Sequence, residues 1–254
     1  MREDARVRLK LPFHRRNRQA RRALCLGAIV IRGEYERVVQ DLTEPAVMET
    51  HQSLTADLDS WLRATELQRE QSPEERRMFS QRLGSWPAQD IINASWRTEA
   101  LGMFVWALGH MTKLPPWDTQ IDQASVIRPL GLMSDPEPFE QSRVRPDDDI
   151  SRARDLAELW HWRARTAQLQ RRGGVQLPAG LTFEEIIAST AKGAHEAGDI
   201  TVPIDADFPA LGKAYRDLDD GEYATATSIA EERHFALNWL CGYAHEWDET
   251  PTDT

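Results

Sequence analysis

Residues 87–111, PAQDIINASWRTEALGMFVWALGHM, decide the fold of this chain. From residue 100 to residue 108 no side chain is polar, and a helix that is apolar on all sides is buried on all sides. Pro87 suits a first helical turn, because its φ is already fixed and its missing N–H is not needed there. Pro115-Pro116 then ends the segment. The stretch predicts a central helix around which the other elements pack.

Two charged residues, Arg97 and Glu99, lie within this predicted helix. They are separated by ~200° of helical rotation, so they cannot pair with each other. A buried charge is costly unless it is paired, so the rest of the chain should supply an acid for Arg97 and a base or hydrogen-bond donor for Glu99. The pattern fits either two ion pairs that clamp a helical core or a polar pocket beside the helix.

The last predicted helix, over residues 229–241, begins with the capping-box pattern SIAE at 228–231 and continues as ERHFALNWL. If it packs on the central helix, Glu232 is the candidate acid for Arg97 and Arg233 is the candidate base for Glu99. A second face carries Glu231, His234, Asn238 and Cys241 at helical spacing.

His234 fits either a hydrogen-bonded core histidine or a base. No short metal-binding motif is present, and we expect no metal and no cofactor. A metal site would need distant ligands, for instance His161, His234, Glu232 and Asp248.

Capping and breaking residues place the elements of the first half. We expect a core helix over residues 17–40, a linker over 43–50 around Pro45, a short helix capped near Ser53 and a helix opened by Ser72 and ended by Gly84. Residues 114–149 are rich in Pro and Asp and form the longest irregular segment, the best place for a lid or binding loop.

In the second half, a helix should follow Asp147-Asp148-Asp149 and end at Gly173-Gly174. A capping box at Thr182 predicts a helix that runs to Gly198. Asp207 with Pro209 is expected to start a short helix to about Leu218. The buried stripe of the first of these helices is formed by Ala153, Ala157, Trp160, Ala164 and Ala167.

Together these elements predict an all-α (mainly α) fold: one globular multi-helix domain over residues 17–254, preceded by a basic arm at 1–16. Cys25 and Cys241 lie in apolar helical contexts without a CxxC motif, which indicates reduced thiols in a cytoplasmic protein. No stretch of about twenty apolar residues exists, so no membrane span is expected.

Charge is distributed unevenly along the chain. Residues 1–22 contain nine basic and two acidic residues, a net charge of +7, and the remainder contains 22 basic and 39 acidic residues, a net charge of −17. An acidic body is a poor scaffold for nucleic acid, so such a partner would have to use the basic arm. Glycine-rich nucleotide loops, a nucleophile elbow and HExxH are all absent from the sequence.

Several polar motifs resemble a mainly bacterial, uncharacterised family, domain of unknown function 4272, over roughly residues 20–254. The family pattern is W-R-x-E-A-L, W-A-L-G, D-L followed by H-W, E-R-H-x-A-L-N-W-L, and a closing W-D and T-D-T. It corresponds here to Trp96, Arg97, Glu99, Trp106, Asp155, Leu156, His161, Trp162, Glu232, Arg233, His234, Asn238, Trp239, Trp247, Asp248, Thr252, Asp253 and Thr254.

Two departures from that pattern are present. Leu159 stands where the family has an arginine, and residues 175–205 look like an insertion that forms a surface elaboration. The resemblance strengthens the list of site residues and implies no activity. Residues 252–254 are expected to dock back onto the body.

Two functions from different classes fit these observations. The first is a non-enzymatic cytosolic interaction or regulatory protein, in which the Arg/Glu/His/Asn set is a buried network and a protein partner meets the acidic surface or the loop at 114–149. The second is a hydrolase-like enzyme with a pocket between the central and C-terminal helices. Its catalytic candidates are Glu99, Glu232 and His234, and the candidate binding residues are Arg97, Asp155, His161, Arg233, Asn238, Trp247 and Asp248.

Overall fold

The chain forms a layered stack of helices in the computed structural model, which describes residues 14–42, 44–173, 177–178 and 180–253. Almost all of the predicted arm at 1–16 lies outside the described residues. The helices are α1 (His14–Asp41), α2 (Pro45–Ala64), α3 (Pro73–Phe79), α4 (Ala88–Ala107), α5 (Gln123–Ile127), α6 (Glu137–Glu140), α7 (Asp147–Arg172), α8 (Phe183–Glu196) and α9 (Asp220–Leu240). Two short strands, β1 (Pro209–Ala210) and β2 (Lys213–Ala214), and four 3₁₀ turns complete the described part.

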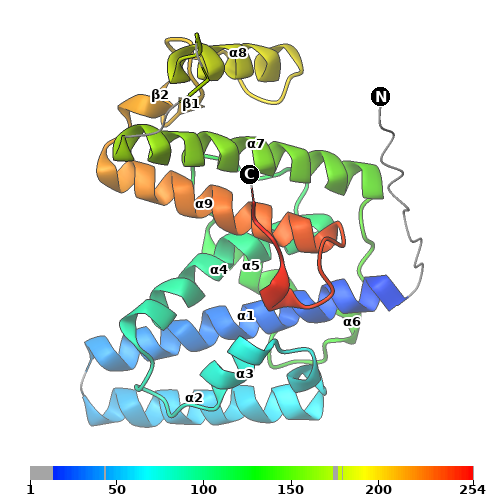
Figure 1. The fold of residues 1–254 in the computed structure, drawn as a ribbon. Coiled ribbons are helices and arrows are strands. Elements are labelled where there is room, and N and C mark those ends of the chain that lie inside the picture. Colours follow the sequence, from blue (N-terminus) through cyan, green and yellow to red (C-terminus); the bar gives the residue numbers. More distant parts are fainter. Residues whose placement is uncertain (1–13, 43, 174–176, 179, 254) are drawn as a thin grey trace.

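Helix α4 is the centre of this stack, as its sequence predicts. Every residue from 98 to 107 is buried. It packs against α1 on one side and α9 on the other, and α9 packs in turn against α7 (Figure 1). Helices α2 and α3 cover the α1 layer, whereas α8 and the strands lie beyond α7 at the opposite end of the molecule (Figure 1). The fold is mainly α, in agreement with the sequence-based expectation.

The segment between α4 and α7 is tied to the core instead of forming a free loop. It contains α5 and α6, and Val126, Leu130 and Phe139 are buried. Gly102 of α4 permits a close approach, because a Cβ at this position would lie 2.1 Å from Cδ1 of Ile121. The irregular segment expected at 114–149 is therefore partly helical and is anchored to the core at several points, although many of its residues are exposed.

Two helices begin earlier than predicted. Helix α2 starts at Pro45, within the expected linker, because proline fits the first position of a helix as well as it fits a linker. Helix α9 starts at Asp220, and a capping box between Asp219 and Glu222 caps its N-terminus. The box-like spacing at Ser228 lies inside the helix, and no glycine or proline lies between Glu222 and Leu240 to interrupt it.

The helix expected from Asp207 to about Leu218 is instead a tight hairpin. Pro209 pairs with Ala214, and Leu211 and Gly212 turn the chain with φ values of 53° and 77°. The carboxylate of Asp207 does not cap a helix, because it accepts two hydrogen bonds of 2.7 Å from the buried Arg163. A long-range ion pair thus overrides the local start signal.

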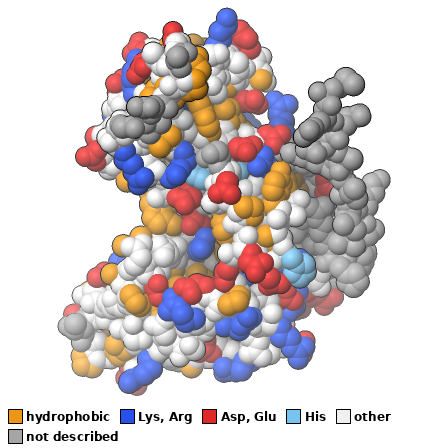
Figure 2. All heavy atoms as spheres, in the orientation of Figure 1, with side chains coloured by type: hydrophobic (Ala, Val, Ile, Leu, Met, Phe, Trp, Pro, Cys, Tyr) orange, Lys and Arg blue, Asp and Glu red, His pale blue; other side chains and the backbone are white. Residues whose placement is uncertain are grey.

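Most other helical boundaries follow the predicted signals, but α3 ends at Phe79 and not at Gly84, and α4 ends at Ala107, before residue 111. Ser72 and Thr182 each form a capping box at the start of α3 and α8. The alanine and tryptophan stripe of α7 is buried throughout. Among the described helices, none combines the length and the apolar character that a membrane crossing requires. Figure 2 shows both signs of charge interspersed on one face, with acidic side chains concentrated in a band across its middle.

Candidate functional site

Glu99 and Arg233 form a buried ion pair between α4 and α9. Nε of Arg233 donates to Oε2 of Glu99 over 2.9 Å, and the two side chains are 0% and 2% exposed. The other carboxylate oxygen of Glu99 accepts from the backbone N–H of Ile121 at 2.9 Å. The sequence-based partner for Glu99 is confirmed.

The remaining donors of Arg233 hold the segment that follows α4. Nη1 donates to the carbonyls of Pro115 and Pro116, and Nη2 donates to the carbonyl of Thr119 at 2.9 Å. The guanidinium also lies over the ring of Trp117, 5.4 Å from its centroid. The pair thus has no hydrogen-bonding capacity left for a substrate, and it fastens the segment that the sequence offered as a lid.

Arg97 and Glu232 form the second predicted pair. Nη1 of Arg97 donates to both carboxylate oxygens of Glu232, at 3.1 and 2.9 Å. The guanidinium packs over the rings of Phe235 and Trp247. Burial raises the pKa of the Glu232 carboxyl, and the neighbouring Arg97 opposes that rise. The charges that were expected to surround a cleft between α4 and α9 therefore neutralise one another in two ion pairs.

The opposite face of α9 carries a histidine pair that it shares with α7. Nδ1 of His234 lies 3.0 Å from Nδ1 of His161, and their rings meet edge to face with centroids 5.3 Å apart. His234 is fully buried and His161 is 4% exposed. Burial lowers the pKa of both imidazoles; for His234, with His161 and Arg154 adding to the effect, it lies at about 3.

A chain of hydrogen bonds fixes the tautomers of this pair. Nε of Arg154 can only donate, and it donates to Oδ1 of Asn238 over 2.8 Å. The amide nitrogen of Asn238 therefore faces the other way and donates to Nε2 of His234 at 3.0 Å and to the carbonyl of Pro251 at 2.8 Å. Nε2 of His234 is an acceptor, so its proton lies on Nδ1, which donates to Nδ1 of His161. His161 must then carry its own proton on Nε2.

The C-terminal segment closes over this network. Trp247 is buried against the rings of Phe104, Phe235 and Trp239, and Thr250 is also buried. The bond from Asn238 to the carbonyl of Pro251 holds the next residues beside α7 and α9. The predicted docking of this segment is thus seen for Thr252 and Asp253, whereas Thr254 lies outside the described residues.

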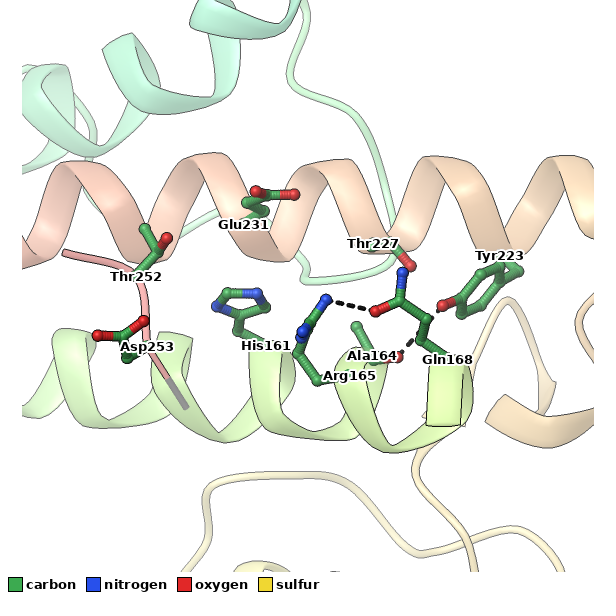
Figure 3. A pocket seen from close by; sticks show the side chains of 9 residues that line it. All are labelled: His161, Ala164, Arg165, Gln168, Tyr223, Thr227, Glu231, Thr252 and Asp253. Atoms are coloured by element: carbon green, nitrogen blue, oxygen red, sulfur yellow. Dashed lines mark hydrogen bonds between the residues drawn. The ribbon is translucent and has the colours of Figure 1, made fainter. Parts of the chain in front are cut away.

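A polar cavity of about 360 Å³ lies where this segment meets α7 and α9. Figure 3 shows the side chains of His161, Arg165 and Gln168 reaching it from α7, Glu231 from α9, and Thr252 and Asp253 from the C-terminal segment. It is lined by His161, Ala164, Arg165, Gln168, Tyr223, Thr227, Glu231, Thr252 and Asp253. This cavity lies between α7 and α9, not between α4 and α9 as the enzyme hypothesis expected.

Charges of both signs surround the ring of His161 in this cavity. After burial, Glu231 is the next largest influence on the pKa of His161 and raises it, whereas Arg165 lowers it. Arg165 donates to the amide oxygen of Gln168, a neutral partner. Within the described part of the chain, no ion pair engages Glu231 or Asp253. The cavity can therefore receive a polar ligand that brings its own charges.

Of the predicted binding residues, His161 lines the cavity, whereas Arg97, Asp155, Arg233, Asn238, Trp247 and Asp248 do not. Asp155 has a side chain that is 73% exposed and 3.3 Å from Nη1 of Arg154. Asp248 accepts from the backbone N–H of Glu74 at the start of α3, over 3.0 Å. Neither contacts the histidine pair. In the described residues no group of three or more potential ligands could hold a metal, so the set of His161, His234, Glu232 and Asp248 does not come together.

Several residues of the cavity were missed by the sequence analysis. Arg165 follows His161 by one helical turn and Gln168 by two, so helical spacing from His161 could have found them. Arg154 could have been suspected on the same face of α7. Tyr223 and Thr227 lie in the part of α9 that precedes Ser228, which was not expected to be helical.

Comparison with known proteins places the chain in one family. A model of the family described as Domain of unknown function (DUF4272) matches residues 15–187, and the chain belongs to this family. The match contains Arg97, Glu99 and His161 and runs into the segment at 175–205 that looks like an insertion, but it ends before α9 and the C-terminal motifs. No curated protein and no solved structure matches the chain.

Proposed function

We propose that this member of the family is a non-enzymatic binding protein of the regulatory type, which takes a small polar ligand in the cavity between α7, α9 and the C-terminal segment. The observation that carries the proposal is the tautomer of His161, that is, which of its ring nitrogens carries the proton. Its Nδ1 accepts a hydrogen bond from His234, so the proton on its Nε2 is available to a ligand. The buried pair Glu99–Arg233 and the half-buried pair Arg97–Glu232 on the other side of α9 then serve the fold.

The fixed tautomer supports binding more than catalysis. A general base needs an accessible lone pair, and the lone pair of His161 is directed at His234. His234 in turn uses Nε2 to accept from Asn238 and is fully buried. Neither histidine offers an accessible base, and Glu99 and Glu232 are held by arginines. The hydrolase alternative would need these contacts to break first.

The state of the cysteines supports a reducing compartment, and we place the protein in the cytoplasm. Cys25 and Cys241 form no disulfide in the described structure. Burial raises the pKa of the Cys25 thiol to about 12, so it is not a reactive thiolate at neutral pH. A thiol of this kind packs as a small apolar side chain.

A thermal-shift screen of the full chain against small polar metabolites tests the proposal. A ligand is expected to raise the melting temperature and to be recovered chemically unchanged. Arg165→Gln should weaken that response, because Arg165 lines the cavity but is itself exposed and outside the core. Arg172→Gln, on the exposed end of the same helix, is the matched control.

Two results would contradict the proposal. One is the conversion of a ligand into a product by the protein. The other is a screen in which no metabolite shifts the melting temperature.

A further inference from the structure

The cavity between α7 and α9 presents unneutralised charges of both signs. Arg165 has a neutral hydrogen-bond partner in Gln168, which leaves its positive charge uncompensated by that contact. Glu231 and Asp253 stand on other walls of the cavity, one on α9 and one on the C-terminal segment (Figure 3). No ion pair of the described structure joins these acids to Arg165 or to another base.

The orientation of His161 is a second, independent sign of a ligand. The side chain is 4% exposed, yet it lines the cavity, and its ring lies between the C-terminal segment and Arg165 (Figure 3). Nε2 carries the proton, because the bonds from Arg154 through Asn238 and His234 leave no other arrangement. No acceptor for that proton is found among the described residues. Nε2 of His161 is not one of the fully enclosed polar atoms of the described structure that lack a partner, so this donor opens into the cavity, where a ligand can accept from it.

We propose, on the basis of the binding function above, that the ligand is a small zwitterion with an ammonium and a carboxylate group, such as a free α-amino acid. Its ammonium group lies toward Glu231 and Asp253. Its carboxylate accepts from Nε2–H of His161 and lies beside the guanidinium of Arg165. The volume of about 360 Å³ is at the small end for a ligand pocket and suits such a molecule.

Other classes of ligand fit the lining less well. A phosphate group would be repelled by Glu231 and Asp253, and a simple polyamine would leave the guanidinium of Arg165 without an acceptor. A nucleobase needs an aromatic surface for stacking. Besides the imidazole of His161, the one aromatic side chain of the cavity lining within the described structure is Tyr223, and its hydroxyl donates to the carbonyl of Ala164 at 3.3 Å. The lining therefore favours a ligand with two opposite charges close together.

Calorimetric titration of the full chain with each common L-α-amino acid tests this assignment. The tightest binder is compared with its N-acetyl derivative, which lacks the ammonium charge, and with its C-terminal amide, which lacks the carboxylate. Each blocked form should bind at least about tenfold more weakly. Equal binding of either blocked form would overturn the assignment, and so would the failure of every amino acid.

Matched variants locate the two charges. Glu231→Gln should weaken binding of the intact amino acid but change the binding of its N-acetyl form little. Arg165→Gln should weaken binding of the intact amino acid but change the binding of its C-terminal amide little. Arg172→Gln should bind like the wild type. If another polar metabolite binds in the cavity and no amino acid does, the zwitterion assignment fails and the binding function stands. If nothing binds, both fail.

Discussion

Replacing His234 with Gln should change how the stability of the protein depends on pH. The imidazole of His234 is fully buried, and its pKa in the folded chain is lowered to about 3 from the ordinary value of 6.5. The unfolded chain therefore takes up the proton first as the pH falls. The stability linked to His234 is complete above about pH 6.5 and is lost as the pH falls toward the folded pKa.

The size of this effect follows from the two pKa values. Between about pH 7.5 and about pH 5, the wild type should lose about 2 kcal/mol of unfolding free energy through His234 alone. The result changes little with the folded pKa as long as that value lies well below 5. At neutral pH, His234→Gln should cost roughly 1–3 kcal/mol, because Asn238 and His161 lose a buried partner. The difference between the two proteins should therefore shrink by about 2 kcal/mol on acidification.

Urea denaturation of both proteins at the two pH values measures this difference. The pair is also compared on a His161→Gln background, so that the second imidazole does not contribute. His245→Gln is the control for the loss of a histidine as such, since that side chain is 81% exposed. A difference between wild type and His234→Gln that stays the same at both pH values would refute the reasoning, because it would mean that His234 titrates alike in the folded and unfolded chains.

The remaining predictions concern the packing of α4. Glu99→Gln should lower the unfolding free energy by about 3 to 5 kcal/mol, since it leaves Arg233 charged and buried without an acid. The double variant Glu99→Gln/Arg233→Met should recover part of that loss in urea denaturation, and no recovery would argue against a direct pair. Gly102→Ala should destabilise by about 1–3 kcal/mol, because its Cβ would meet Ile121 at 2.1 Å. In an Ile121→Ala background, Gly102→Ala should be nearly neutral. If Gly102→Ala lowers the melting temperature there as much as it does in the wild type, the close approach of Gly102 and Ile121 is contradicted.

The ion pairs between α4 and α9 were predictable because helical periodicity determines which side chains of a helix lie on the same face. A charge inside an apolar stretch needs a partner, and the helical spacing of Glu232 and Arg233 offered one for each charge of α4. Only the packing of α9 on α4 had to be assumed. The hairpin after Asp207 was not predictable in the same way, because its cause is Arg163, 44 residues earlier in the chain.

The candidate site depended on contacts that local patterns do not contain. His161 and His234 are 73 residues apart, and the tautomers of both depend on Arg154 and on a carbonyl of the C-terminal segment. A sequence shows which side chains can donate or accept, but not which donor meets which acceptor. The residues of the network could therefore be named from the sequence. The cavity, and the proton that Nε2 of His161 presents to it, could be found only from the structure.

One turn of α9 separates the structural role from the proposed binding role. Successive residues of a helix point about 100° apart, so Glu231, Glu232, Arg233 and His234 face four directions. Glu232 and Arg233 face α4 and pair with its charges, whereas Glu231 and His234 face α7 and the cavity side. Because the pairs on the α4 side fix the rotation of the helix, they also fix where the cavity groups point. Loss of a pair with α4 should therefore weaken ligand binding even though neither member of the pair touches the ligand.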